Sequence, residues 1–257
     1  MLRVLAIGDV VGQAGCEILA EKLPALKREQ KIDLVIVNGE NSAEGNGITP
    51  HSAEQLFACG AQIITTGNHA FKRREIYELF DREDYFIRPY NYGNGAPGKG
   101  VCFYDFLSYR VCVINLSGTV YMDNLENPFS CIDRILKEVS PKDIVLLDFH
   151  AEATSEKRAM GFYLDGRITA MWGTHTHVQT ADEQILPGGT GYITDLGMTG
   201  PLISVIGVRP ELAIERLKTH LPVRFKNAGH PSGISGILLE IDEKTQKTTQ
   251  IIRLNIH

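Results

Sequence analysis

Eight side chains that could bind metal ions or transfer protons lie in short polar turns, each directly after an apolar run. They are Asp9, Glu40, Asn41, Asn68, His69, His150, His175 and His177. A single Asp or Asn in a turn usually hydrogen-bonds its own backbone. Chance does not readily place so many ligand-type residues at the ends of five apolar runs. If those runs are strands that share one sheet edge, the eight side chains form one site.

The residue types indicate a centre with two divalent ions. Imidazole nitrogen and carboxylate or amide oxygen suit Mn, Fe or Zn, whereas a thiolate site would need a nearby Cys, and the chain has none there. Two ions about 3.5–4 Å apart clamp a phosphoryl group and activate a bridging water. Such a pair needs a shared ligand, and the carboxylate of Glu40 is the natural candidate because it has two oxygens.

The His175-Thr176-His177 segment is the most specific local signal. Alternate residues of an extended segment point the same way, so both imidazoles are expected to face one site. The alternative, a pair of solvated loop histidines, stays open at this point.

The charge of such a centre indicates an anionic substrate. Two divalent ions bring four positive charges, of which Asp9, Glu40 and a hydroxide cancel three. The positive remainder favours a phosphate ester over a neutral peptide or ester.

The elements that must position these residues alternate along the first part of the chain. Apolar runs predict strands at 4–7, 34–37, 63–64, 144–149 and 168–172, and helical spacing predicts helices at 14–29, from Thr49-Pro50, near 73–75, at 130–139 and past Pro210. Antiparallel pairs are expected at 101–106 with 110–116 and at 236–241 with 250–256. We find no repeat and no linker. The expectation is one α/β domain over residues 1–257, with its site at the carboxyl ends of the strands.

Composition excludes several classes of protein. The chain is 43% hydrophobic and 22% charged, which is typical of a globular protein rather than a disordered one. No apolar run reaches the roughly 18 residues of a membrane span, and the first residues do not resemble a signal peptide. Five scattered cysteines are typical of reduced thiols in a cytoplasmic protein. The net charge of −5 argues against coating nucleic acid by charge alone, but leaves a local RNA contact and a homo-oligomer open.

The polar turns resemble the five motifs of the calcineurin-like metallophosphoesterases. They are Gly8-Asp9, Asn38-Gly39-Glu40-Asn41, Gly67-Asn68-His69, His150 and Gly173-Thr174-His175-Thr176-His177. Val11 replaces the usual His of the first motif, and Glu40 replaces the usual bridging Asp of the second. Both departures are those of the bacterial YmdB-type branch, and the likeness covers essentially the whole chain.

This resemblance implies a four-layer αββα sandwich of two mixed β-sheets flanked by helices. It implies one ion on Asp9, Glu40, Asn41 and His177, and a second ion on Glu40, Asn68, His150 and His175. His69 would not bind metal but would act as general acid, or as an electrophile on the phosphoryl group. The implied activity is hydrolysis of 2',3'-cyclic nucleotides, and of 3',5'-cyclic AMP as a further substrate, by a metal-bridging hydroxide.

Two other functions remain open from the residues alone. A binuclear amidohydrolase barrel would carry its His-x-His on the first strand, where this chain has only Asp9. A non-catalytic regulator acting on RNA metabolism through partners would keep the metal ligands but would have no use for His69.

Residues close to the proposed ligands could assist them. Glu152 and Asp182 could orient imidazoles, although neither role is the favoured one. Lys72, Arg73 and Arg88 could neutralise a phosphate, but solvated surface charges are the better expectation. Thr119 and Tyr121 could touch substrate, but packing or solvent contact is favoured.

Overall fold

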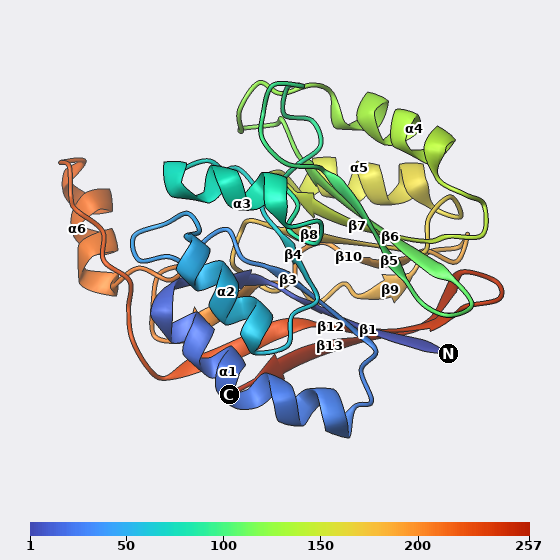
Figure 1. Cartoon of the computed structure of the whole chain (residues 1–257). Coiled ribbons are helices and arrows are strands. Elements are labelled where there is room, and N and C mark those ends of the chain that lie inside the picture. Colours follow the sequence, from blue (N-terminus) through green and yellow to red (C-terminus); the bar gives the residue numbers. More distant parts are fainter.

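The structure is a computed structural model that describes all 257 residues, with two β-sheets, six α-helices and one 3-10 helix (Figure 1). The first sheet comprises β1 (Leu2–Ile7), β2 (Asp9–Val10), β3 (Leu34–Asn38), β4 (Ile63–Thr65), β11 (Met198–Pro201), β12 (Ser232–Asp242) and β13 (Lys247–Ile256). The second comprises β5 (Val101–Asp105), β6 (Arg110–Ser117), β7 (Ile144–His150), β8 (Ala170–Thr174), β9 (Gln184–Ile185) and β10 (Gly191–Ile193). The helices are α1 (Gly12–Glu29), α2 (Pro50–Ala58), η1 (Arg74–Ile76), α3 (Tyr77–Arg82), α4 (Pro128–Glu138), α5 (Thr154–Leu164) and α6 (Pro210–Thr219).

Both sheets contain parallel and antiparallel pairs. In the first, β1, β3 and β4 are parallel neighbours and β12 runs antiparallel to β1. In the second, β6, β7, β8 and β10 are parallel and β5 pairs antiparallel with β6. The predicted hairpin and the predicted terminal strand pair are therefore confirmed.

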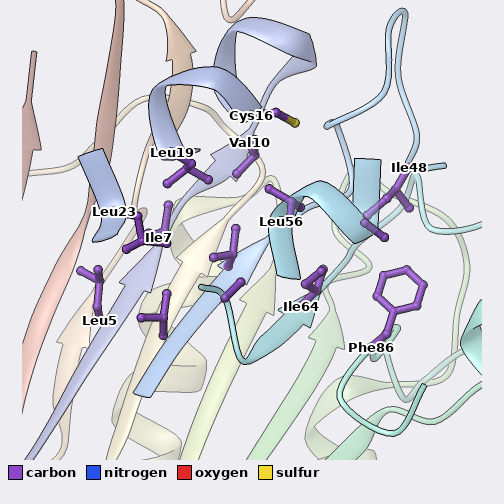
Figure 2. Packing of buried hydrophobic residues seen from close by; sticks show 14 of the residues in the cluster. Leu5, Ile7, Val10, Cys16, Leu19, Leu23, Ile48, Leu56, Ile64 and Phe86 are labelled. Carbon is purple, nitrogen blue, oxygen red and sulfur yellow. The ribbon is translucent and has the colours of Figure 1, made fainter. Parts of the chain in front are cut away.

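Three separate apolar cores show that the elements form four layers. Alternate residues of β1 lie in different cores. Leu5 and Ile7 pack with helices α1 and α2 (Figure 2), while Val4 and Ala6 pack against the second sheet. The far face of the second sheet packs on α4 and α5. Strands buried on both faces are near-continuous apolar runs, which is why the sequence revealed them. The predicted αββα sandwich is confirmed.

Most helices begin and end close to where the sequence indicates. Thr49 caps α2, since its hydroxyl oxygen accepts from Ser52 N at 3.1 Å and Pro50 follows at the first helical position. The helix expected near residues 73–75 is a single 3-10 turn that continues into α3. Asp9–Val10, expected within a turn, form the short strand β2 beside β11.

Two parts of the fold differ more from the expectation. Helix α5 was not anticipated, and it buries two charged residues, Glu156 and Lys157, on its inner side. Helix α6 stands away from the layers at one edge of the molecule (Figure 1), and its Ile214 and Leu217 are exposed. None of the helices is both long and apolar enough to cross a bilayer.

Candidate metal centre

The structure brings all eight predicted site residues to one edge of the sandwich. The first sheet supplies them from strand β2 and the turns after β3 and β4, and the second from the end of β7 and the turn after β8. The first group is Asp9, Glu40, Asn41, Asn68 and His69, and the second is His150, His175 and His177. Because the parallel strands of both sheets end at this edge, side chains as far apart in the sequence as Asp9 and His177 meet there.

One group of contacts surrounds the imidazole of His150. Its Nε2 lies 2.9 Å from Asn68 Oδ1, 3.0 Å from Glu40 Oε1 and 3.0 Å from His175 Nδ1. The ligand atoms of Glu40, His150 and His175 all lie within 4.8 Å of one another. Glu40 follows a strand of the first sheet, and His150 and His175 come from the second, so the cluster connects the two sheets.

A second group surrounds His177 and shares Glu40 with the first. His177 Nε2 lies 3.6 Å from Asp9 Oδ1 and 3.3 Å from Asn41 Nδ2, and the same amide nitrogen lies 3.4 Å from Glu40 Oε1. Asn41 Oδ1 instead accepts from His69 Nδ1 at 2.8 Å. Asn41 would therefore have to turn its amide over to offer oxygen to an ion beside His177.

The ring orientation of each of these three histidines is fixed through its other nitrogen. His175 Nε2 donates to Glu152 at 2.9 Å, and His177 Nδ1 donates to the carbonyl of Ile206 at 2.9 Å. His150 Nδ1 donates to Thr174 Oγ1 at 2.9 Å. Such partners fix the tautomer and leave the opposite nitrogen as a free electron pair, which is how metal-binding histidines are held.

A chain of hydrogen bonds connects His150 through Thr174 to the fully buried carboxylate of Asp148. Thr174 Oγ1 donates to Asp148 Oδ1 at 2.7 Å, so its oxygen is free to accept from His150. Asp148 also accepts from Thr65 Oγ1 and Asn38 Nδ2, on β4 and β3. Burial raises the pKa of Asp148 to about 6. Asp148 thus joins the two sheets directly beneath the site, and sequence analysis missed it. A lone Asp inside the apolar run of β7 was the available signal.

The His175-Thr176-His177 segment reaches the site in a different way from the one expected. It is not extended: His175 has φ 103° and His177 has φ 63°, in the region that residues other than Gly rarely adopt. The premise that alternate residues of an extended segment point the same way was wrong. Both rings reach the site through this strained turn instead, and backbone strain of this kind concentrates at functional sites.

The Asp195 carboxylate holds that turn in place. It accepts from Thr176 N at 3.2 Å and Gly197 N at 2.8 Å, and pairs with the buried ammonium of Lys157 at 2.7 Å. Lys157 of α5 therefore supports the site indirectly: it pairs with Asp195, and Asp195 accepts from the backbone of Thr176, between His175 and His177.

Gly67 is required by the packing of His150. A Cβ at this position would lie 2.2 Å from the His150 ring. Only glycine lets the chain of the first sheet pass so close to an imidazole of the second.

Of the residues that the sequence suggested as assistants to the ligands, Glu152 contacts a site histidine, and Asp182, Arg88 and Arg73 make structural contacts. Glu152 does orient an imidazole, whereas Asp182 binds Thr180 and Thr194 and touches none. Arg88 is buried and donates to backbone carbonyls of residues 89–98, so it is a structural residue. Arg73 donates to the carbonyls of Glu44 and Asn46 and fixes the loop beside the site.

Three smaller candidates remain beside these. Thr119 bonds Glu156 and is a packing contact. Tyr121 is exposed. Lys72 lies close enough to His69 for its charge to lower the pKa of that imidazole, in addition to the larger effect of burial.

The electrostatics keep the two site carboxylates ionised. Burial alone would raise their pKa values, but His177 and His150 hold the pKa of Asp9 well below its usual range, and His150 lowers the pKa of Glu40. Asp9 in turn raises the pKa of His177 to about 9, against the effect of burial. Burial lowers the pKa of His69 and of His175. Glu40 likewise raises the pKa of His150, against the effect of burial. The anionic carboxylates suit a divalent cation, and an ion bound here would displace the protons that Asp9 and Glu40 favour on His177 and His150.

The donor set fits divalent ions. Around His150, ring nitrogens and carboxylate or amide oxygens converge within 3.0 Å of its Nε2, which is a set of donors that a cation can bind. Oδ1 of Asp9 is buried without a hydrogen-bond partner, which is costly unless a cation satisfies it. Nitrogen and oxygen donors with no sulfur suit Mn, Fe or Zn.

An open cleft of about 370 Å³ leads to these side chains. Its floor includes Glu40, Asn41, His69, His175 and His177. Its outer wall comes from two later segments, residues 206–208 and Phe225 with Asn227, which sequence reasoning missed.

Comparison with known proteins agrees with this geometry. The YmdB-like protein family matches residues 5–254 of the chain. The chain belongs to this family. The YmdB-like assignment confirms the resemblance seen in the motifs.

Relatives of this YmdB-like chain cover its whole length. The 2',3'-cyclic-nucleotide 2'-phosphodiesterase of Bacillus subtilis is 44% identical over 257 residues, which is 100% of this chain and 97% of that protein. A solved structure of a protein from Thermus thermophilus has a TM-score of 0.94 at 38% identity and covers 99% of this chain and 98% of that one. A phosphatase structure from Mycoplasma pneumoniae has a TM-score of 0.94 at 33% identity, with 99% and 93% covered. The names of the Bacillus subtilis and Mycoplasma pneumoniae proteins are those of phosphoric ester hydrolases, the class predicted from the site.

Proposed function

We propose that this YmdB-like chain is a two-metal phosphodiesterase that opens 2',3'-cyclic nucleotides. The observation that carries the proposal is the donor cluster centred on Glu40, with Asp9 Oδ1 buried and unpartnered beside it, at the floor of an open cleft. The similarity to the Bacillus subtilis 2',3'-cyclic-nucleotide 2'-phosphodiesterase supports the same substrate class. We include 3',5'-cyclic AMP as a second substrate to be tested.

The residues would hold two ions, Fe or Mn by preference and Zn as an alternative. Glu40, Asn68, His150 and His175 would hold one ion. Asp9, Glu40, Asn41 and His177 would hold the other. When bound, such ions supply Lewis acidity and lower the pKa of a water molecule. Strand β2, the end of β7 and the turns after β3, β4 and β8 keep these ligands aligned before substrate arrives.

His69 is proposed as the general acid. Its backbone N donates to Glu40 Oε2 at 2.9 Å, which holds the residue at the cleft floor. The Nδ1 contact with Asn41 Oδ1 at 2.8 Å would be exchanged when Asn41 turns its oxygen to an ion, and Nε2 is available in either case. In the reaction a water molecule loses a proton to solvent and its oxygen bonds to phosphorus, the P–O2' bond breaks, and the 2'-oxygen takes the Nε2 proton of His69 in its imidazolium form. Because burial lowers the pKa of His69, this form is a stronger acid than a free imidazolium, and it takes up a proton from solvent before the next turnover. The product is a 3'-phosphomonoester with a free 2'-hydroxyl.

The test is turnover by the purified, metal-reconstituted protein. We expect hydrolysis of 2',3'-cyclic nucleotides and of bis(p-nitrophenyl) phosphate with Mn or Fe. Asp9→Asn and Glu40→Gln keep side-chain shape but remove the charge that binds the ions. Since Lewis-acid catalysis contributes several kcal/mol, each should lower the rate by roughly 10³-fold or more.

The matched control is Glu54→Gln, which changes an exposed carboxylate on α2 and should leave the rate unchanged. Undiminished turnover in both site variants would overturn the proposal. Metal binding without turnover of any phosphodiester would instead favour the non-catalytic regulator.

A further inference from the structure

A second hollow adjoins the catalytic cleft and is rich in cations. It has a volume of about 480 Å³ and shares three lining residues, Gly45, Phe225 and Asn227, with the cleft. The rest of its lining is Arg209, Arg224, Lys226 and Glu44. We call this hollow the side pocket. Because the linings are shared, the side pocket lies directly beside the cleft.

The backbone brings these cations together from two separate segments. Arg209 N donates to the Lys226 carbonyl at 3.0 Å, and Ala228 N donates to the Gly207 carbonyl at 2.8 Å. Residues 207–209 and 226–228 thus run side by side. The same ribbon begins at Ile206, whose carbonyl holds His177. The side pocket is therefore fixed in position relative to the metal ligands.

The charge of the side pocket is opposite to that of the whole chain. None of Arg209, Arg224 and Lys226 forms a salt bridge in the structure, and Glu44 is the one acidic residue in the lining. The net charge of the whole chain is −5. Unpaired cations in a concave surface attract anions, especially phosphates.

An exposed aromatic ring stands where the two hollows meet. Phe225 is 47% exposed and lines both of them, between Arg224 and Lys226 in the chain. Alternating cations and aromatic rings bind single-stranded nucleic acid, because the cations follow the phosphates and the ring stacks on a base.

We propose that the substrate is a single-stranded RNA whose 3' end carries the 2',3'-cyclic phosphate. The cyclic phosphate occupies the metal centre, the preceding phosphodiesters lie in the side pocket, and Phe225 stacks on a base near the end. This proposal rests on the proposed function and extends it. A cyclic mononucleotide has a single phosphate, which the metal centre takes, so it leaves Arg209, Arg224 and Lys226 without a ligand.

Binding tests the side pocket independently of catalysis. The probe is a fluorescent uridine decamer with a 3'-phosphate, followed by anisotropy at several salt concentrations. For the double variant Arg224→Ala/Lys226→Ala we expect about tenfold weaker binding and a salt slope smaller by roughly 1.4, since each phosphate contact on a single strand contributes about 0.7. Phe225→Ala should weaken binding roughly 5- to 150-fold through lost stacking.

The matched control is Arg216→Ala/Lys218→Ala on α6, which removes the same charge from the preceding helix, outside both hollows. An equal loss in this control would overturn the proposal, because the effect would then be one of overall charge. A phosphoserine peptide of the same charge that competes as well as the decamer would also contradict it.

Kinetics separate this inference from the proposed function. We expect kcat/KM for a decamer ending in 2',3'-cyclic phosphate to exceed that for 2',3'-cyclic UMP by about tenfold, and the Arg224→Ala/Lys226→Ala variant to lose this advantage while keeping its activity on 2',3'-cyclic UMP. Equal values for the two substrates in the unaltered protein would overturn the RNA proposal and leave the phosphodiesterase intact. Binding that depends on the side pocket, without turnover of either substrate, would overturn the phosphodiesterase instead.

Discussion

At the scale of single residues, three histidines of the site are arranged as metal ligands, whereas a fourth, His69, is free to act on substrate. Three imidazoles each have one nitrogen tied to a fixed partner and the other turned to the centre. His69 differs, because its fixed nitrogen binds Asn41 and its second nitrogen has no protein partner. That difference predicts opposite outcomes for substitutions only a few ångströms apart.

Replacing His69 should affect the rate and not the metal content. His69→Ala removes the proposed proton donor, so kcat should fall by roughly two to four orders of magnitude, the usual range for general acid–base catalysis. Metal content, measured by plasma mass spectrometry, should stay at that of the unaltered protein. His51→Ala, an exposed histidine on α2, is the matched control. An unchanged kcat in His69→Ala would remove this residue from the reaction.

Replacing Thr174 should affect metal affinity. Thr174→Val keeps the shape but breaks the path from His150 to Asp148, and losing such a support typically weakens metal binding 10- to 100-fold. Chelator competition measures the affinity. The control, Thr169→Val, removes a buried hydroxyl from the segment just before β8, far from the site. Equal metal affinity in the two variants would show that the Thr174 hydroxyl serves packing alone.

At the scale of elements, what the sequence could predict depends on how local the signal is. Strands β1, β3 and β7 are buried on both faces, so their apolar runs reveal them without knowledge of any partner. Their polar ends then locate the site, because parallel strands of one sheet end at the same edge.

The elements that the sequence did not reveal depend on distant partners. Helix α5 buries Lys157 against Asp195 and Glu156 against the backbone of Thr119, 38 and 37 positions away. These charged residues interrupt the apolar pattern of its inner side. Asp148 was missed for the same reason, since Asn38 and Thr65 bind it from 110 and 83 positions away. A local pattern cannot show that a buried charge has a partner.

The buried pair of Lys157 on α5 with Asp195, which holds the His175–His177 turn, should be important for stability. Lys157→Met leaves the Asp195 carboxylate buried without its counter-ion, which typically costs about 3–5 kcal/mol. Urea unfolding of the metal-free protein measures this loss. The same change in an exposed pair, Lys99→Met beside Asp84, should have little effect because such pairs contribute little. Similar losses in the two variants would show that burial of the pair is not what matters.

At the scale of the whole molecule, the proposed metal ligands come from both sheets. Asp9 and Glu40 belong to the first sheet and His150 and His175 to the second, and their donor atoms meet between the layers. The unfolded chain cannot present this arrangement, because the ligands are spread from residue 9 to residue 177. Ions that bind here must therefore stabilise the fold as a whole, and two of them would bring the net charge from −5 to about −1.

Metal removal should consequently lower the unfolding temperature. An ion at 100 times its dissociation constant stabilises the folded state by about 2.7 kcal/mol. For a chain of this length each kcal/mol raises Tm by roughly 2–4 °C, so each ion should add about 5–10 °C. Calorimetry of the Mn-loaded and EDTA-treated protein measures the difference. Glu40→Gln should abolish the rise, because Glu40 is the donor shared by both groups, whereas Glu54→Gln should keep it. A rise that persists in Glu40→Gln would place the stabilising ions elsewhere on the molecule.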